Sequence, residues 1–105
     1  MTHWDVLITQ DAELNDKIQA WRSHVNNGPN LDRKYKELLM VSMSCVRMFQ
    51  DGIRIHGKFA LDFGATPKEL FAAIEQSMFI GGIPAFMYGA QIFFELCPEA
   101  VNGGK

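Results

Sequence analysis

Apolar residues recur at helical spacing near the start of the chain. Four of them, separated by four, three and four residues, predict a first helix from Thr9 to about Val25: Leu14, Ile18, Trp21 and Val25. The segment "NNGPN", residues 26–30, ends this helix. Gly and Asn tolerate left-handed backbone, and Pro29 cannot continue a helix.

A second helix is predicted to begin near Asp32, a good N-cap residue. One face of it carries Leu31, Tyr35, Leu38, Leu39, Ser42, Cys45, Val46 and Phe49. Much of the other face is apolar too, through Met40, Val41, Met43 and Met48. Because a helix that is apolar on more than one side should be buried on more than one side, we expect a central helix or a subunit interface here.

The clearest helix junction lies in the segment "DFGATPKE", residues 62–69. Gly64 can cap the preceding helix, Thr66 can be an N-cap and Pro67 suits the first helical position. Glu69 stands three residues after Thr66 and completes a capping box. We therefore expect one helix to end before Gly64 and the next to begin after Thr66.

Two further helices follow. The first is marked by Leu70, Phe71, Ile74, Met78 and Phe79, and "GGIP" interrupts it. Pro84 can begin the last helix, on one side of which lie Phe86, Ala90, Phe93, Phe94 and Cys97. Pro98 ends that helix, and residues 99–105 are predicted to form a frayed tail. Since no stretch alternates with a period of two, the predicted fold is all-α with five or six helices.

Composition indicates a globular protein. With 105 residues, 48% of them hydrophobic and 21% charged, the chain is expected to form a single domain, residues 1–105. The high apolar content of so small a chain favours a homo-oligomer. A net charge of −2 with interspersed signs argues against nucleic-acid or membrane partners. The apolar runs are short and there is no signal-like N-terminus, so a soluble cytoplasmic protein is expected.

The cysteines and histidines give no sign of a metal site. Cys45 and Cys97 lie too far apart for metal-ligand spacing, and two buried, reduced thiols are the simplest interpretation. His3 and His24 have no ligand-like neighbours. We expect no metal and no cofactor.

One stretch, "ELLMVSMSCVRMFQDGIRIH", places an acid and a histidine at its two ends. In one unbroken helix the 19 residues from Glu37 to His56 would span about 28 Å, too far for cooperation. A chain reversal between Met48 and Gly52 would make two antiparallel helices and could bring the carboxylate and the imidazole together. Gly52 lowers helix propensity, and "QD" at positions 50 and 51 can cap a new helix.

The segments "LDRKYKELLMVSMS" and "IRIHGKFALDFGATPKELFAAIEQSMFIGGIPAFMYGAQIFFE" resemble the carboxymuconolactone decarboxylase family, over residues 31–95. The resemblance implies the all-α alkylhydroperoxidase D-like fold with a central antiparallel helix pair, and assembly as trimers or hexamers. It places Glu37 and His56 at a conserved acid and histidine of the redox branch. The two cysteines of that branch fall at Phe49 and Gly52, so the chain is expected to lie outside the CxxC branch.

The resemblance also implies a set of site residues. Glu37 and His56, with Asp51 assisting, are the candidate catalytic groups for acid/base chemistry on a small organic acid or lactone, a lyase-like decarboxylation or an isomerisation. Candidate substrate-binding residues are Phe49, Gly52, Arg54 and Cys45. Five of these residues also have a purely structural interpretation: a capping acid for Glu37 and Asp51, a satisfied histidine for His56, a solvated cation for Arg54 and core packing for Cys45.

Two alternatives stay open. The chain could be a non-catalytic, oligomeric ligand-binding protein that kept the family scaffold and lost its chemistry. A pocket filled by Phe49, with no solvent path to His56, would support this alternative. The chain could also be a hydroperoxide reductase working through Cys45, although a lone thiol has no second cysteine placed to resolve it.

Overall fold

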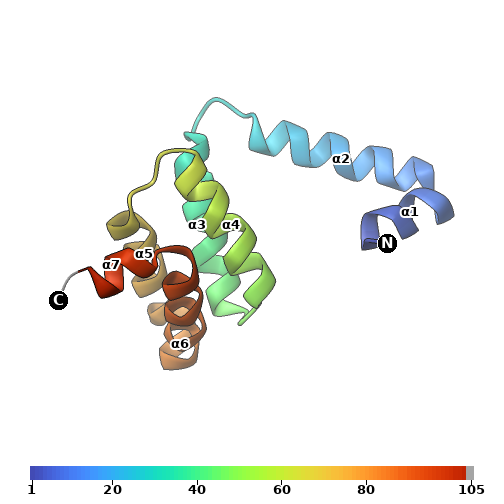
Figure 1. Ribbon diagram of the computed structural model, residues 1–105. Helices are drawn as coiled ribbons and strands as arrows, with labels where there is room; N and C mark the ends of the chain where they lie inside the picture. Colours follow the sequence, from blue (N-terminus) through green and yellow to red (C-terminus); the bar gives the residue numbers. More distant parts are fainter. Residues whose placement is uncertain (104–105) are drawn as a thin grey trace. The chain divides into compact units, whose positions relative to one another are not determined.

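The computed structural model describes residues 1–103, and within them the chain forms seven α-helices and no strand (Figure 1). The all-α prediction is confirmed. Contacts divide the chain into two compact units, residues 1–31 and the part from Asp32 onward.

The first unit contains α1 (His3–Gln10) and α2 (Ala12–Asn26). The prediction of one helix from Thr9 to Val25 was wrong, because the chain breaks at Asp11, where φ is −156° and ψ is 79°. The Asp11 carboxylate accepts a hydrogen bond from the Leu14 N–H at 3.0 Å and so caps α2. Thr2 and Asp5 form a capping box at the start of α1. Neither helix has a buried residue.

The second unit is built around α3 (Arg33–Val46) and α4 (Gln50–Asp62), which pack side by side (Figure 1). The buried residues of α3 are Glu37, Val41 and Cys45, four apart, so the helix buries a narrower stripe than the predicted face. Tyr35 and Leu39, which lie on that predicted face, are exposed. The small residues Gly57 and Ala60 are buried on α4.

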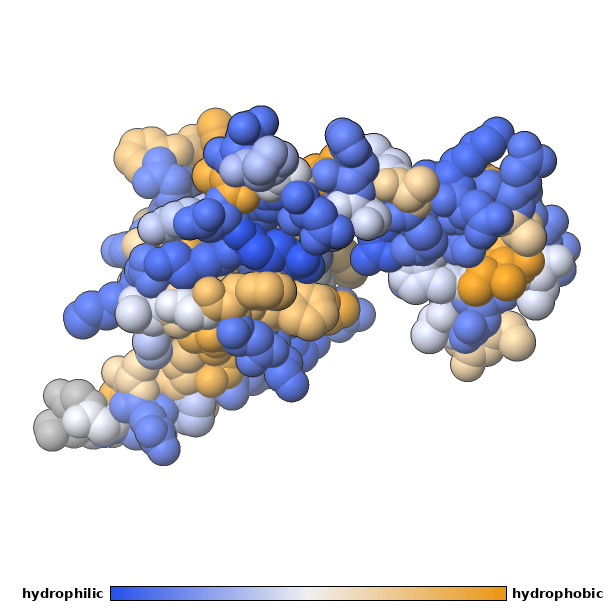
Figure 2. Space-filling view, turned by 90° about the horizontal axis from the view of Figure 1, so that it is seen from above, coloured by the Kyte–Doolittle hydropathy of each residue, from blue (hydrophilic) through white to orange (hydrophobic). Residues whose placement is uncertain are grey.

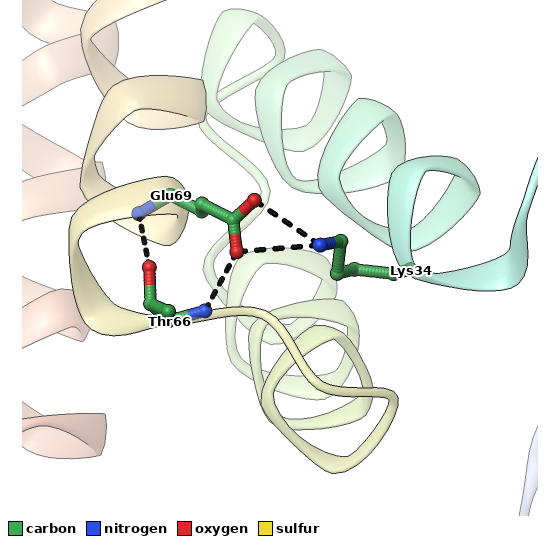
Figure 3. Close-up of polar contacts among 3 residues, drawn as sticks. All are labelled: Lys34, Thr66 and Glu69. Carbon is green, nitrogen blue, oxygen red and sulfur yellow. Dashed lines mark hydrogen bonds and ion pairs between the residues drawn. The ribbon is translucent and has the colours of Figure 1, made fainter.

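The predicted junction after residue 62 is confirmed. Gly64 has a φ of 100°, and α5 (Pro67–Gln76) begins with the capping box of Thr66 and Glu69. Glu69 also receives a hydrogen bond from Lys34 of α3 at 3.2 Å, and so joins α5 to the central pair (Figure 3). Hydrogen bonds from the Thr66 backbone and from Lys34 hold the pKa of Glu69 below its usual value.

Helix α6 (Met78–Leu96) completes the core. Gly82, with φ 71° and ψ −169°, kinks it two residues before Pro84, which agrees with the predicted interruption at "GGIP". The core joins α3, α4, α5 and α6 through Val41, Cys45, Ile53, Leu70, Ile74, Ala85, Ile92, Phe93 and Cys97.

The C-terminal prediction was partly wrong. Pro98 does follow the end of α6, but it also occupies the first turn of a short helix, α7 (Pro98–Asn102). Proline suits this position, where its missing N–H has no intrahelical partner to lose. Residues 99–102 are therefore helical and not frayed. Of the predicted tail, residues 104–105 lie outside the described residues.

Among the described helices, α6 alone has the length and hydropathy of a membrane span. Gly82 kinks this helix, and its residues Ala85, Gly89, Ile92 and Phe93 are buried.

Candidate functional site

The chain reverses at residues 47–49, between α3 and α4. The Phe49 N–H donates to the Ser44 carbonyl at 2.9 Å, and the Met48 N–H donates to the Cys45 carbonyl at 2.9 Å. With Met48 at a φ of 54°, these two bonds form a Schellman motif that ends α3. The predicted reversal is confirmed, and Glu37 and His56 can meet across the helix pair.

Glu37 is a buried carboxylate in the middle of this pair. Only 1% of its side-chain surface is exposed. Its Oε2 lies 2.8 Å from Nδ1 of His56 on α4. His56 keeps 28% of its side-chain surface exposed, so the pair joins a buried acid to an imidazole that solvent can reach.

The other oxygen of Glu37 is held by Arg33, one turn earlier on α3. Nε and a terminal nitrogen of the guanidinium both lie 3.1 Å from Oε1. The guanidinium also stacks over the Phe63 ring, 4.7 Å from its centroid. Sequence reasoning did not single out Arg33, although the spacing of four between a cation and an acid on one helix is a signal that could have found it.

The geometry of the pair decides which imidazole nitrogen is available. An ionised Glu37 can only accept a hydrogen bond; in that state Nδ1 would donate its proton to Glu37, and the neutral ring would have its lone pair on Nε2. A carboxylate in this place also stabilises the imidazolium that forms when Nε2 takes up a proton. The arrangement can therefore move a proton to or from a group beside Nε2.

The structure gives Asp51 and Arg54 other partners. Asp51, which is well exposed, pairs with Arg54 at 3.1 Å, and Arg54 reaches Glu95 of α6 at 2.8 Å. The hydrogen bonds to Arg54 lower the pKa of Glu95, and those to Glu95 raise the pKa of Arg54. In the described chain, no hydrogen bond or ion pair brings Asp51 to Glu37 or His56. Asp51 belongs to a surface ion-pair network with Arg54 and Glu95, and its assisting role stays a prediction.

The remaining predicted substrate-binding residues lie at or near the reversal. Cys45 is fully buried in the core, and burial raises the pKa of its thiol, which disfavours the reactive thiolate. Gly52 is buried against the Phe49 ring, where a Cβ would lie 2.6 Å from a ring carbon. Phe49 itself is more than half exposed. The burial of Cys45 agrees with its structural interpretation as core packing.

Two open grooves lie elsewhere on the second unit. The larger, about 1110 Å³, is lined by Met48, Pro84, Phe86, Met87, Tyr88, Ala90, Gln91, Phe94 and Glu95. A second, about 840 Å³, is lined by residues of α5, α6 and α7 together with Thr66. Neither lining includes Glu37 or His56. Phe86, Met87 and Tyr88 of α6 line the larger groove, whereas Phe49, Met78 and Phe79 are not part of its lining.

Over residues 1–103, no group of three or more His, Cys, Asp or Glu side chains is placed to hold a metal ion.

Comparison with known proteins agrees with the all-α fold. The model of the carboxymuconolactone decarboxylase family matches residues 12–95, which is most of the chain and takes in parts of both compact units. No curated protein sequence is similar enough to count as a match.

Proposed function

The chain belongs to the carboxymuconolactone decarboxylase family, and we propose that it catalyses cofactor-independent proton transfer on a small organic acid or lactone. The observation that carries this proposal is the 2.8 Å hydrogen bond between buried Glu37 and solvent-accessible His56. A histidine oriented by a carboxylate is a common arrangement for a general base or acid.

In an isomerisation, Nε2 of His56 would take a proton from the carbon next to the substrate carbonyl. The electron pair of the broken C–H bond moves into the enolate, and Glu37 stabilises the imidazolium. Return of the proton to another carbon of the conjugated system regenerates neutral His56. In a decarboxylation, the C–C bond breaks, carbon dioxide leaves, and the imidazolium protonates the carbon that keeps the electron pair; solvent then restores the proton.

Two alternatives receive less support. A Phe49 that closes off His56 would support a purely ligand-binding protein, but Phe49 is more than half exposed and His56 retains exposed surface. A peroxidase would need an accessible thiolate, and Cys45 is buried with a raised pKa.

The experiment follows the exchange of substrate protons with solvent, because this measurement does not require the natural product to be known. The protein is incubated in D₂O with a panel of lactone acids and unsaturated organic acids, and deuterium incorporation is followed by NMR. We expect at least one compound to exchange faster with the protein than in buffer, and Cys45→Ser to exchange it at the same rate. Absence of exchange and of product across the panel would count against proton-transfer chemistry. Loss of exchange in Cys45→Ser would favour thiol chemistry instead.

We also propose that the chain works as a homo-oligomer. Apolar side chains are exposed on both units (Figure 2), and those of Phe79, Ile80, Ile83 and Met87 on α6 are among the most exposed. Such an apolar surface is large for a monomer. Sedimentation velocity should give a mass above that of one chain, and Ile80→Lys together with Ile83→Lys should lower it. A wild-type protein that sediments as a monomer would contradict the proposal.

A further inference from the structure

Arg33 and His56 hold opposite oxygens of the same carboxylate. Arg33 donates from two nitrogens to Oε1 of Glu37, each at 3.1 Å, while Oε2 is left for Nδ1 of His56 at 2.8 Å. The guanidinium is itself steadied by the Phe63 ring beneath it. The arrangement fixes the orientation of the carboxylate with respect to the imidazole.

Because Glu37 is buried, the positive charge of Arg33 matters for the ionised form of the Glu37 carboxyl. A carboxylate with 1% of its side chain exposed has lost almost all of its hydration, and this loss favours the neutral acid unless a cation or strong donors compensate. Arg33 supplies a full positive charge and two donors at hydrogen-bond distance, and 30% of its own side chain remains in contact with solvent. Arginine stays charged at any pH at which the protein is folded.

The protonation state of Glu37 decides which way the hydrogen bond to His56 runs. An ionised Glu37 accepts, so the imidazole carries its proton on Nδ1 and has its lone pair on Nε2. A protonated Glu37 donates to Nδ1, and the proton of the neutral ring then sits on Nε2, which can no longer act as a base. The two states have the same heavy-atom geometry, but Nε2 carries a lone pair in the first and a proton in the second.

We propose that Arg33 is a positioning residue that sets the direction of the Glu37–His56 hydrogen bond, holding Glu37 as the acceptor so that His56 presents Nε2 as the base. The catalytic meaning of this inference rests on the proposed function. The direction of the hydrogen bond does not, and it can be measured without any substrate.

The test is the tautomer of His56, read from the imidazole nitrogen shifts in ¹⁵N NMR at a pH where the ring is neutral. The signals are assigned by their loss in His56→Gln. Arg33→Met removes the charge but keeps the length and helix propensity of the side chain. Arg33→Lys keeps the charge. Lys34→Met is the matched control, because Lys34 is the next cation on α3 and its carboxylate partner is Glu69.

We expect the wild type, Arg33→Lys and Lys34→Met to show the Nδ1–H tautomer, and Arg33→Met to shift largely to Nε2–H. The proton-exchange rate of Arg33→Met should fall at least about 10-fold, with kcat affected more than KM, since a positioned base contributes roughly 10²–10⁴-fold. If circular dichroism shows that Arg33→Met does not fold, Arg33→Gln replaces it.

An Arg33 variant without charge that keeps the wild-type nitrogen shifts would overturn the inference. A wild-type His56 in the Nε2–H tautomer would overturn it as well. An Arg33→Lys variant with His56 in the Nε2–H tautomer would refute the role given to the charge. A protein with the expected tautomers but no exchange activity would instead refute the proposed function and leave the role of Arg33 in place.

Discussion

Glu37→Gln is expected to lower the rate of proton transfer by about 10²- to 10⁴-fold while the fold is retained. Glutamine has nearly the volume of glutamate, so the buried space on α3 stays filled. Its amide is neutral and cannot stabilise the imidazolium, and its NH₂ group can donate to Nδ1 and so select the wrong tautomer. The exchange rate in D₂O measures the loss, and a thermal melt followed by circular dichroism checks the fold.

His56→Gln should cause a loss of similar size, and the double variant should be little worse than either single one. Residues that act as a unit are strongly non-additive, because removing one already disables the other. Asp51→Asn is the matched control: it makes the same acid-to-amide change in the surface network with Arg54 and Glu95. Full activity in Glu37→Gln, or a comparable loss in Asp51→Asn, would show that the roles are assigned to the wrong carboxylate.

The structural elements that could be predicted from the sequence are those whose signals are local. Thr66, Pro67 and Glu69 each have the side chain that their position at the start of α5 requires, so the junction can be found without knowledge of the rest of the fold. The same holds for the N-terminal boundary of α3 at Asp32, although its side chain makes no capping hydrogen bond.

The reversal at residues 47–49 was harder to predict, because its left-handed position is Met48 and not glycine. A glycine there would have marked the end of α3, as Gly64 marks the end of α4. The break at Asp11 was missed because the apolar positions that predicted the helix, Leu14 to Val25, all lie after it, and only the capping side chain of Asp11 marks the boundary.

The acid and the histidine were identified through the family resemblance, but their surroundings depend on packing. Which face of α3 is buried follows from contact with three other helices, and a sequence that is apolar on two faces does not reveal it. For the same reason Asp51, only five residues from His56, joins Arg54 and Glu95 instead. Glu95, the other partner of Arg54, is distant in sequence and is brought near only by the packing of α6 against α4.

Ile53→Ala is expected to lower the free energy of unfolding by about 2–5 kcal/mol. Ile53 lies one turn before His56 on α4, is 1% exposed, and belongs to the core cluster with Val41 and Cys45 of α3. Removing three carbons there leaves a cavity between the two helices that bring Glu37 and His56 together. For a domain that is stable by about 5–15 kcal/mol, this loss is large.

Urea denaturation followed by far-ultraviolet circular dichroism measures the change. Tryptophan fluorescence is a poor probe of this core, because Trp4 and Trp21 both lie in the first unit. Ile55→Ala is the control: it removes the same atoms from the same helix at a position that is 51% exposed, and it should change the stability by no more than about 0.5 kcal/mol. Equal losses in the two variants would mean that Ile53 does not hold α4 against α3, and that the contact between Glu37 and His56 depends on other residues.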